Sequence, residues 1–225
     1  MNLDAVIFDW GGTLTPWHTV DHLDCWLSVT GDPARARALS AAEERVWIAM
    51  RDEHRSGTVD QIVREAGLSL TEAQRREYYR WWDAHSYTDP AVPELFSALH
   101  ARGLKVGILS NTVWPALEHQ RIFARDEIHH LIDGEVYSSE IEWTKPHPEA
   151  FQAALDAVGV TDPSRAVYVG DRLFEDVFGA NQAGMRSVFI PHSDIPAHQQ
   201  TGVEGTPDAV VHELGELVAV IDSWL

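Results

Sequence analysis

Short apolar runs recur along the chain and end in glycine or polar residues. The first covers residues 5–8, in a strand predicted at residues 3–8, and stops at Asp9. Others lie in the stretches 105–109, 166–169 and 187–190. Runs of this length and composition are typical of buried parallel strands. Stretches with helical spacing separate them. This alternation predicts an α/β fold, a Rossmann-like core with a doubly wound, mostly parallel sheet.

Glycines and prolines mark the ends of the elements in the second part of the chain. Each predicted strand there is followed by a helix or a short loop. We expect strands at residues 105–109, 134–137, 166–169, 187–190 and 210–211, helices at 93–101, 115–125, 149–158, 174–183 and 213–224, and a long irregular loop from Pro191 to Pro207.

The segment from residue 16 to residue 87 differs from the rest, because helical periodicity runs through all of it. Helix start signals recur at Asp32, Thr58 and Thr71. Aromatic residues near its end fall at helix-face spacing, and we expect most of them to pack inside a bundle: Tyr78, Tyr79, Trp81 and Trp82. We therefore predict a helical cap domain, residues 16–87, inserted between the first and second strands of a core domain that comprises residues 1–15 and 88–225.

Acidic residues outnumber basic ones, and the formal net charge is −18. A surface of this charge repels nucleic acid and anionic lipid, so we expect neither as a partner. The acidic pairs Glu43-Glu44 and Asp52-Glu53 are expected on solvated helix faces. The single Cys25 forms no internal disulfide, and no secretory signal or membrane-spanning run is evident. These features predict a cytoplasmic protein.

Three aspartates lie at or just after the ends of predicted strands. Asp9 ends the first strand, Asp171 follows the run 166–169, and Asp176 comes five residues later. The carboxyl ends of parallel strands meet at one edge of a sheet, where ligands bind in such folds. Converging carboxylates repel one another unless a cation lies among them, and Mg²⁺ is the expected ion because it prefers oxygen ligands.

Other polar residues follow neighbouring strands and suit a phosphate ligand. Ser110 offers a hydroxyl and Asn111 a backbone N–H to a phosphate oxygen. Lys145, one of only two lysines, offers a compact positive charge. A carboxylate held beside a metal ion and a lysine is a credible nucleophile toward phosphorus, and Asp9 is the candidate.

Four ordered motifs carry a resemblance to a known family: FDWGGTL, ILSNT, KPHPEAF and VGDRLFEDVFGANQAG. Together they resemble the haloacid dehalogenase-like (HAD) hydrolase superfamily from Leu3 to about Ile190. The resemblance implies a Rossmann-like core with a helical cap after the first motif. It also implies that Asp9 forms an aspartyl-phosphate, that Ser110 binds phosphate and Lys145 neutralises charge, and that Asp171 is a metal ligand. Asp176 is similar to the second acid of the fourth motif.

Position 11 departs from the family pattern. Phosphatases of the superfamily usually carry a second aspartate there, which protonates the leaving oxygen and activates water, and this chain has Gly11. The backbone carbonyl of Gly11 still serves as a metal ligand by this resemblance. General acid–base assistance, worth roughly 10²- to 10⁴-fold, is missing. His18, Asp21 and His22 are candidates for a substitute acid, or else solvated hinge residues.

Further residues beside the motifs are candidates for contact with substrate. Trp17 and Trp114 lie next to residues of the first and second motifs, and His18 follows Trp17. Arg172 adjoins Asp171, where it either forms a salt bridge or contacts substrate or cap. The other histidines, His129 and His130 among them, lack the spacing of metal ligands and are expected on the surface.

The leading hypothesis is an Mg²⁺-dependent phosphatase that acts on a small phosphorylated metabolite. Two alternatives are cleavage of a carbon–phosphorus bond, as in phosphonoacetaldehyde hydrolase, and cleavage of a carbon–halogen bond, as in haloacid dehalogenases. The former requires a cap lysine, and residues 16–87 contain none. Haloacid dehalogenases look metal-free, and they do not carry a fourth motif of the Gly170-Asp171 type that this chain has. A third alternative is a catalytically silent homologue that binds a phosphorylated ligand or a protein.

Overall fold

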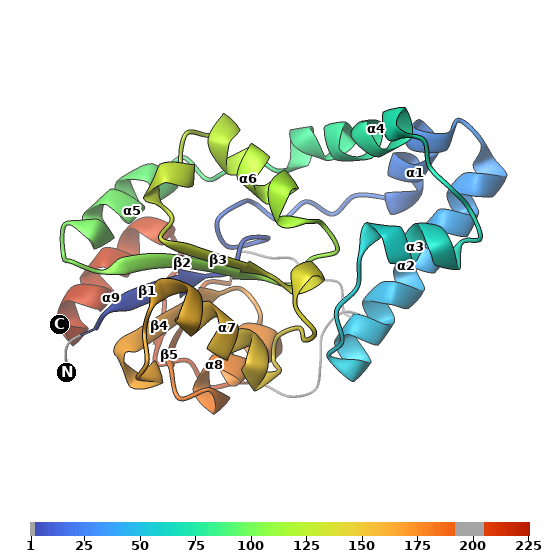
Figure 1. Cartoon of the computed structure of the whole chain (residues 1–225). Helices are drawn as coiled ribbons and strands as arrows, with labels where there is room; N and C mark the ends of the chain where they lie inside the picture. The colour runs from blue at the N-terminus through green and yellow to red at the C-terminus, as the bar shows by residue number, and fades with distance from the viewer. Residues whose placement is uncertain (1–2, 192–204) are drawn as a thin grey trace.

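Six parallel strands form one sheet in the computed structural model, which describes residues 3–191 and 205–225. The strand order is β3-β2-β1-β4-β5-β6 (Figure 1). Every pairing in the described sheet is parallel, which confirms the predicted α/β class. The strands are β1 (Ala5–Phe8), β2 (Lys105–Ser110), β3 (Gly134–Tyr137), β4 (Ala166–Gly170), β5 (Arg186–Phe189) and β6 (Ala209–Val210).

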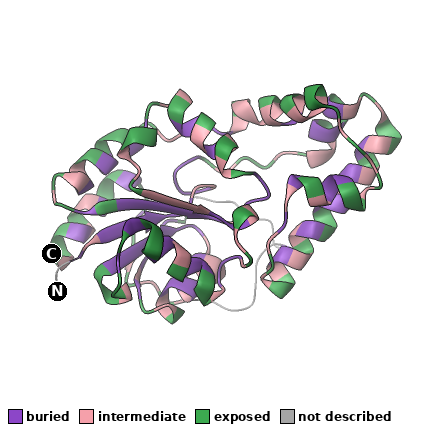
Figure 2. Cartoon of the chain, viewed as in Figure 1, coloured by how far each residue is buried: buried purple, intermediate pink, exposed green. Residues whose placement is uncertain are grey.

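Helices cover both faces of the sheet. Successive side chains of a strand point to opposite sides, so a strand that is apolar throughout needs cover on both faces. Val6 and Phe8 belong to the apolar cluster beneath α5, α6 and α9, whereas Ala5 and Ile7 belong to the cluster beneath α7 and α8. Figure 2 shows the central strands buried, the edge strand β3 largely intermediate, and the helices buried on one side. These helices are α5 (Val92–His100), α6 (Ala116–Arg125), α7 (Pro148–Val158), α8 (Gly179–Gln182) and α9 (Leu217–Trp224).

The segment after β4 differs from the predicted helix over residues 174–183. Leu173–Phe178 is a π-helical turn, η5, and α8 continues from it for one turn only. The wider turn brings the Asp176 carboxylate back toward β4, where its Oδ2 accepts a hydrogen bond from the backbone N–H of Arg172 at 2.8 Å. The π-helical turn therefore interrupts the regular helix and positions the Asp176 side chain. Such turns are frequent at functional sites. The predicted loop from Pro191 to Pro207 lies mostly outside the described residues.

Four of the five α-helices between β1 and β2 lie apart from the sheet, on one side of the molecule (Figure 1). The predicted start signals are confirmed, since the side chains of Asp32, Thr58 and Thr71 each accept a hydrogen bond from a backbone N–H of the following helix. The division of the chain into two domains stays a prediction, and we refer to residues 16–87 as the helical insert. Its helices are α1 (His22–Thr30), α2 (Pro33–Glu53), α3 (Val59–Glu65) and α4 (Glu72–Trp82).

Hydrogen bonds at the ends of the helical insert and at the turn after α2 connect it to the rest of the chain. At its ends, the Thr15 hydroxyl donates to the carbonyl of Tyr87 at 2.8 Å, which ties the outgoing and returning segments together. At the turn after α2, backbone bonds join residues 54–56 to residues 142–144, with Ser56 N–H donating to the carbonyl of Glu142 at 3.1 Å. The second contact lies on the loop that leads directly to Lys145. No helix among the described residues is long and apolar enough to span a membrane.

One acidic side chain of the insert is buried, contrary to the expectation of a solvated face. Glu43 is only 3% exposed, and its Oε2 accepts a hydrogen bond from the Trp26 indole at 2.7 Å. His22 Nδ1 lies 3.0 Å from the same oxygen. Burial alone lowers the pKa of His22, but its hydrogen bond to Glu43 and the charge of Glu43 outweigh this and raise it. A buried carboxylate thus depends on two donors from α1.

We expect Trp26→Phe to lower the free energy of unfolding by about 1–3 kcal/mol, because the aromatic ring remains but a donor to the buried Glu43 carboxylate is lost. Urea unfolding measures the difference. Trp47→Phe is the matched control, since it changes a half-buried tryptophan on α2. Equal stability of both variants and the unmodified protein would show that the indole bond contributes nothing.

Candidate active site

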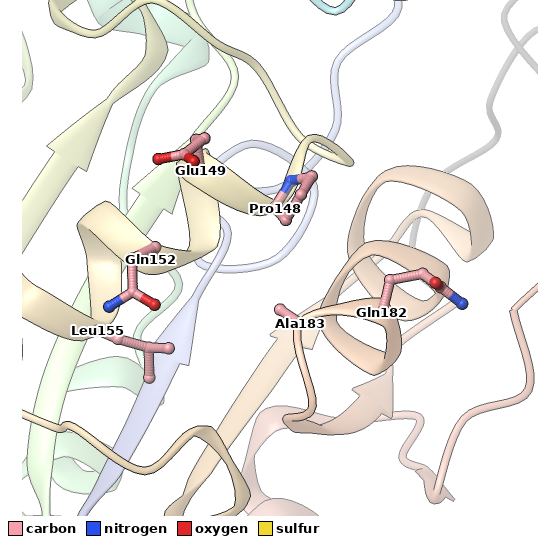
Figure 3. Close-up of a pocket in the computed structure, with 6 residues that line it drawn as sticks. All are labelled: Pro148, Glu149, Gln152, Leu155, Gln182 and Ala183. Atoms are coloured by element: carbon pink, nitrogen blue, oxygen red, sulfur yellow. The ribbon is translucent and has the colours of Figure 1, made fainter.

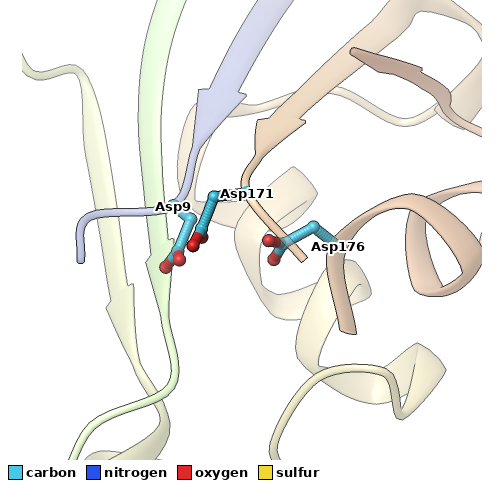
Figure 4. A group of neighbouring side chains, drawn as sticks. All are labelled: Asp9, Asp171 and Asp176. Carbon is cyan, nitrogen blue, oxygen red and sulfur yellow. The ribbon is translucent and has the colours of Figure 1, made fainter. Parts of the chain in front are cut away.

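Three buried carboxylates meet at the carboxyl edge of the sheet, as the sequence predicts (Figure 4). Asp9 follows β1, Asp171 follows β4, and Asp176 lies in η5. Because β1 and β4 are neighbours in the sheet, the first two side chains emerge side by side. One oxygen from each of the three residues lies within 4.8 Å of the others.

The ammonium group of Lys145 lies between two of these carboxylates. Its Nζ is 2.9 Å from Oδ1 of Asp9 and 2.7 Å from Oδ1 of Asp176, and the side chain is 2% exposed. Burial alone would lower the pKa of Lys145, but the charges of Asp176 and Asp9 outweigh it and raise the pKa. Lys145 therefore stays protonated in the site. It also donates to the Tyr168 hydroxyl at 2.7 Å, which in turn donates to the carbonyl of Leu109.

The arrangement of charges suits a divalent cation. Burial, together with the charge of Asp9, raises the pKa of Asp176 to about 6 even though Lys145 acts in the opposite direction. Removal from water is the main cause of this shift, and the charge of Lys145 has a larger effect on Asp176 than the charge of Asp9. A further cation would favour the ionised form of this buried acid. Several carboxylate oxygens with no nitrogen or sulfur ligand form the kind of site that Mg²⁺ prefers. Asp9, Asp171 and Asp176 fit such an ion by number, type and spacing.

Ser110 and Asn111 lie at the end of β2, next to β1 in the sheet. Ser110 is 2% exposed, at the same edge as Asp9. The side chain of Asn111 makes a pair of hydrogen bonds with the backbone of Lys145: its Nδ2 donates to the Lys145 carbonyl at 2.9 Å, and its Oδ1 accepts from the Lys145 N–H at 2.8 Å. Asn111 thus fixes the peptide that carries the lysine, a contact that the sequence analysis did not anticipate. The predicted N–H donation to phosphate stays a prediction.

The glycine at position 11 is not required by crowding. A Cβ atom built on Gly11 meets no atom within 4 Å, and its φ is not in the left-handed region. The next residue differs, because Gly12 has φ of 84°, a conformation that favours glycine. The aspartate that the family usually carries at position 11 would therefore have room here.

The three candidates for a substitute acid have partners within the helical insert or its hinge. Asp21 caps α1 by accepting from the N–H of Leu23, and His22 pairs with Glu43. His18 is exposed, with its ring 5.4 Å from that of His85. Among the described contacts, none joins these side chains to the three carboxylates.

The predicted aromatic candidates have different surroundings. Trp114 is 7% exposed, and its indole donates to the Tyr78 hydroxyl at 3.1 Å, which joins the core to α4. Its ring also lies 5.7 Å from the rings of Trp10 and Trp82, so it packs at the junction with the insert. Trp17 instead lies beneath the guanidinium of Arg172, whose Cζ is 4.8 Å from the ring centre.

Two buried polar residues near the site have no signal in the sequence. Tyr168 is in an apolar strand, and only the fold brings its hydroxyl to Lys145. His119 lies in α6, fully buried, with its ring 4.6 Å from Trp10 and stacked at 4.2 Å on Tyr137. Its Nε2 is 3.2 Å from the Thr112 hydroxyl. Burial lowers the pKa of His119 to about 3, so this histidine is neutral in the folded protein.

A family model described as haloacid dehalogenase-like hydrolase matches residues 3–184. The chain belongs to this family. The match includes all of the motifs that contribute Asp9, Ser110, Lys145 and Asp171 to the carboxyl edge of the sheet. The haloacid dehalogenase-like assignment therefore agrees with the resemblance inferred from the four motifs.

Proteins that are similar to this chain in sequence include enzymes named as phosphatases. Glyceraldehyde 3-phosphate phosphatase of Methanopyrus kandleri is 34% identical over 132 residues, 59% of this chain and 55% of that protein. The match thus spans about half of that relative. Phosphoserine phosphatase of Thermus thermophilus is 33% identical over 197 residues, 84% of this chain and 69% of that protein. The structure of a HAD phosphatase from Thermococcus onnurineus has a TM-score of 0.70 at 22% identity, covering 97% of this chain and 98% of that one, and shows the same fold.

A hollow lies between α7 and the end of α8 (Figure 3). It has a volume of about 280 Å³ and contains one acidic side chain and no basic one. None of its residues belongs to the carboxylate site. Its lining residues are Pro148, Glu149, Gln152, Leu155, Gln182 and Ala183.

We expect His119→Phe to reduce the acid sensitivity of the fold. A histidine whose pKa is lower in the folded than in the unfolded state binds its proton only on unfolding, so its contribution to stability falls as pH decreases from about 6.5 toward about 3. Relative to the variant, the unmodified protein should lose about 2 kcal/mol of unfolding free energy between about pH 6 and about pH 4. Denaturant unfolding at each pH measures this. His130→Phe, at an exposed position, is the control; parallel curves for His119→Phe and the unmodified protein would contradict the assignment.

Proposed function

We propose that this protein is a metal-dependent phosphatase that transfers the phosphoryl group of a small phosphorylated molecule to Asp9 and then hydrolyses the aspartyl-phosphate. The observation that carries the proposal is the contact between Asp9 and a buried, protonated Lys145 within a cluster of three carboxylates. The names of the related phosphatases support the same reaction class.

Each residue of the site has a distinct role in this proposal. Lys145 holds Oδ1 of Asp9, so the other carboxylate oxygen, Oδ2, is the atom we assign to the attack on phosphorus. The Ser110 hydroxyl and the Asn111 N–H bind phosphate oxygens. Asp176 orients Lys145 through Oδ1, while its Oδ2 holds the loop at Arg172.

Asp9, Asp171 and the carbonyl of Gly11, with Asp176 beside them, would hold Mg²⁺. When bound, the ion supplies positive charge that attracts the phosphoryl group and withdraws charge from its oxygens. The bond from phosphorus to the leaving oxygen breaks as the bond from Asp9 to phosphorus forms. Water then attacks the aspartyl-phosphate, which releases inorganic phosphate, restores the carboxylate and passes a proton to solvent.

Gly11 determines which leaving groups are suitable. No side chain at position 11 protonates the departing oxygen, so the leaving group must be stable as an anion. Acyl and aryl phosphates meet this condition, whereas simple alkyl phosphates do not. We therefore propose that the preferred substrates have acidic leaving groups.

The rival reactions have less support. Schiff-base chemistry on phosphonoacetaldehyde requires a free lysine. Lys145 is enclosed by carboxylates, and Lys105 pairs with Asp133 at the opposite end of β2. Halide release from a haloacid is a direct assay for the dehalogenase alternative, and binding of a phosphorylated ligand without turnover would indicate a silent homologue.

We expect log(kcat/KM) on a series of aryl phosphates to fall steeply as the pKa of the leaving phenol rises, because no acid assists its departure. Gly11→Asp should flatten the series and raise the rate for the least acidic phenols by about 10²- to 10⁴-fold. Gly11→Asn, of equal size but without an acidic proton, is the matched control. A flat series for the unmodified protein would show that another group donates the proton.

Mg²⁺ should raise the midpoint of thermal unfolding in a concentration-dependent manner, because an ion that binds only the folded state stabilises it. Asp171→Asn should abolish this shift and reduce kcat/KM by at least about 10²-fold. Asp24→Asn changes an exposed aspartate of α1 and should leave both quantities unchanged. An Asp171→Asn variant that retained the full shift would contradict the assigned metal site.

A further inference from the structure

A stacked pair of side chains lies beside the carboxylate cluster and has no role in the proposed reaction. Arg172 directly follows Asp171, and its guanidinium lies over the ring of Trp17, with 4.8 Å between Cζ and the ring centre. Trp17 belongs to the segment that leaves the first motif, where Gly11 pairs with Thr15 in an isolated bridge. The pair therefore lies where the first motif, after Asp9, and the fourth motif, after β4, meet.

Both side chains carry hydrogen-bond donors, and the indole N–H donor of Trp17 is buried without an acceptor in the described part of the chain. The one ion pair of Arg172 in the described part of the chain is with Oδ2 of Asp171, at 3.6 Å from Nε, which is too long for a hydrogen bond. The Arg172 side chain is 17% exposed, and its guanidinium nitrogens keep some access to solvent, so a ligand can reach them. A buried donor without a partner is costly, and it calls for an explanation.

The chemistry of these donors selects an anion. A guanidinium has five N–H groups in a fixed fork that matches the oxygens of a carboxylate or a phosphate. The Trp17 N–H adds a neutral donor beside it. Stacking on the indole restricts the guanidinium, so less side-chain freedom is lost when a ligand binds.

We propose that Arg172 and Trp17 form a second anion subsite, which binds a carboxylate or a second phosphoryl group of the substrate next to the phosphoryl group that is transferred. This inference rests on the proposed phosphatase function and narrows it. The preferred substrates are small phosphorylated molecules that carry a further anionic group. The open space beside Gly11 leaves room for the part of the substrate that links the two groups.

A purely structural role would give a different result. If Arg172 only offsets the charge of Asp171, its replacement would affect all substrates equally. If it binds a second anion, its replacement would affect only substrates that carry one. The ratio of two rates on matched substrates therefore separates the two roles.

The test compares phenyl phosphate with 3-carboxyphenyl phosphate, whose leaving phenols have similar acidity because an ionised meta carboxylate withdraws little charge. We expect the carboxylated substrate to have the higher kcat/KM by about 10- to 100-fold in the unmodified protein. Arg172→Gln should reduce this ratio to about 1, and Arg172→Lys should retain part of it. Trp17→Phe keeps the ring and removes the N–H, and should reduce the ratio by about 3- to 10-fold.

A matched control exists in the same chain. Arg186, at the start of β5 and so at the opposite edge of the sheet, lies over Trp224 with 5.0 Å between Cζ and the ring centre. Arg186→Gln removes the same charge from the same kind of stack. It should leave the substrate ratio unchanged.

A binding measurement gives a readout that does not require turnover. Calorimetry measures the dissociation constants of benzylphosphonate, 3-carboxybenzylphosphonate and benzene-1,3-bis(methylphosphonate). Tighter binding of either doubly anionic probe, lost in Arg172→Gln, supports the subsite, and the stronger of the two identifies the preferred anion.

The outcomes distinguish the subsite from the function it rests on. Turnover of both aryl phosphates without preference, or a preference that survives Arg172→Gln, overturns the subsite and leaves the phosphatase proposal in place. If neither aryl phosphate is turned over, but the doubly anionic probes bind more tightly in a way that depends on Arg172, the phosphatase proposal is overturned and the subsite is supported. Neither turnover nor binding overturns both.

Discussion

The structure of the site depends on one buried cation, the ammonium group of Lys145. It joins the end of β1, through Asp9, to η5, through Asp176, and a tyrosine of β4 accepts its third hydrogen bond. Loss of one partner from a buried ion pair of this kind typically costs about 3–5 kcal/mol, because the remaining charge is left without compensation. The same contact that organises the fold at this edge also sets the charge around the proposed nucleophile.

The position of Asp176 requires a glycine on the strand beside it. A Cβ atom built on Gly170 would lie 2.3 Å from the Asp176 carboxyl group, so no other residue fits at the end of β4 without displacing the acid. The π-helical turn and this glycine act together, since one returns the carboxylate toward the strand and the other leaves space for it. The pairing of glycine and aspartate at residues 170 and 171 thus has a steric reason as well as a chemical one.

The helical insert is connected to the site by more than its two linkers. Aromatic packing at Trp114 joins α4 to the loop after β2, and backbone bonds join residues 54–56 to the residues just before Lys145. A displacement of the insert would therefore disturb the loop before Lys145, whose backbone Asn111 holds by two hydrogen bonds. The position of the insert is therefore coupled to the position of Lys145 through this loop.

Local patterns in the sequence were sufficient for the strands, most helix starts and the convergence of Asp9, Ser110, Lys145 and Asp171. Apolar runs, capping residues and strand ends are properties of neighbouring residues, and parallel strands necessarily bring their carboxyl ends together. Other features depend on partners distant in the chain. The burial of Glu43 requires Trp26, the contact of Tyr168 requires Lys145, the neutral state of His119 requires the rings that enclose it, and Arg172 meets Trp17 only because the first and fourth motifs adjoin. Packing, hydrogen bonding and desolvation between such residues arise only when the chain is folded, so the sequence by itself determined the framework and its acids, and the tertiary structure decided their environment.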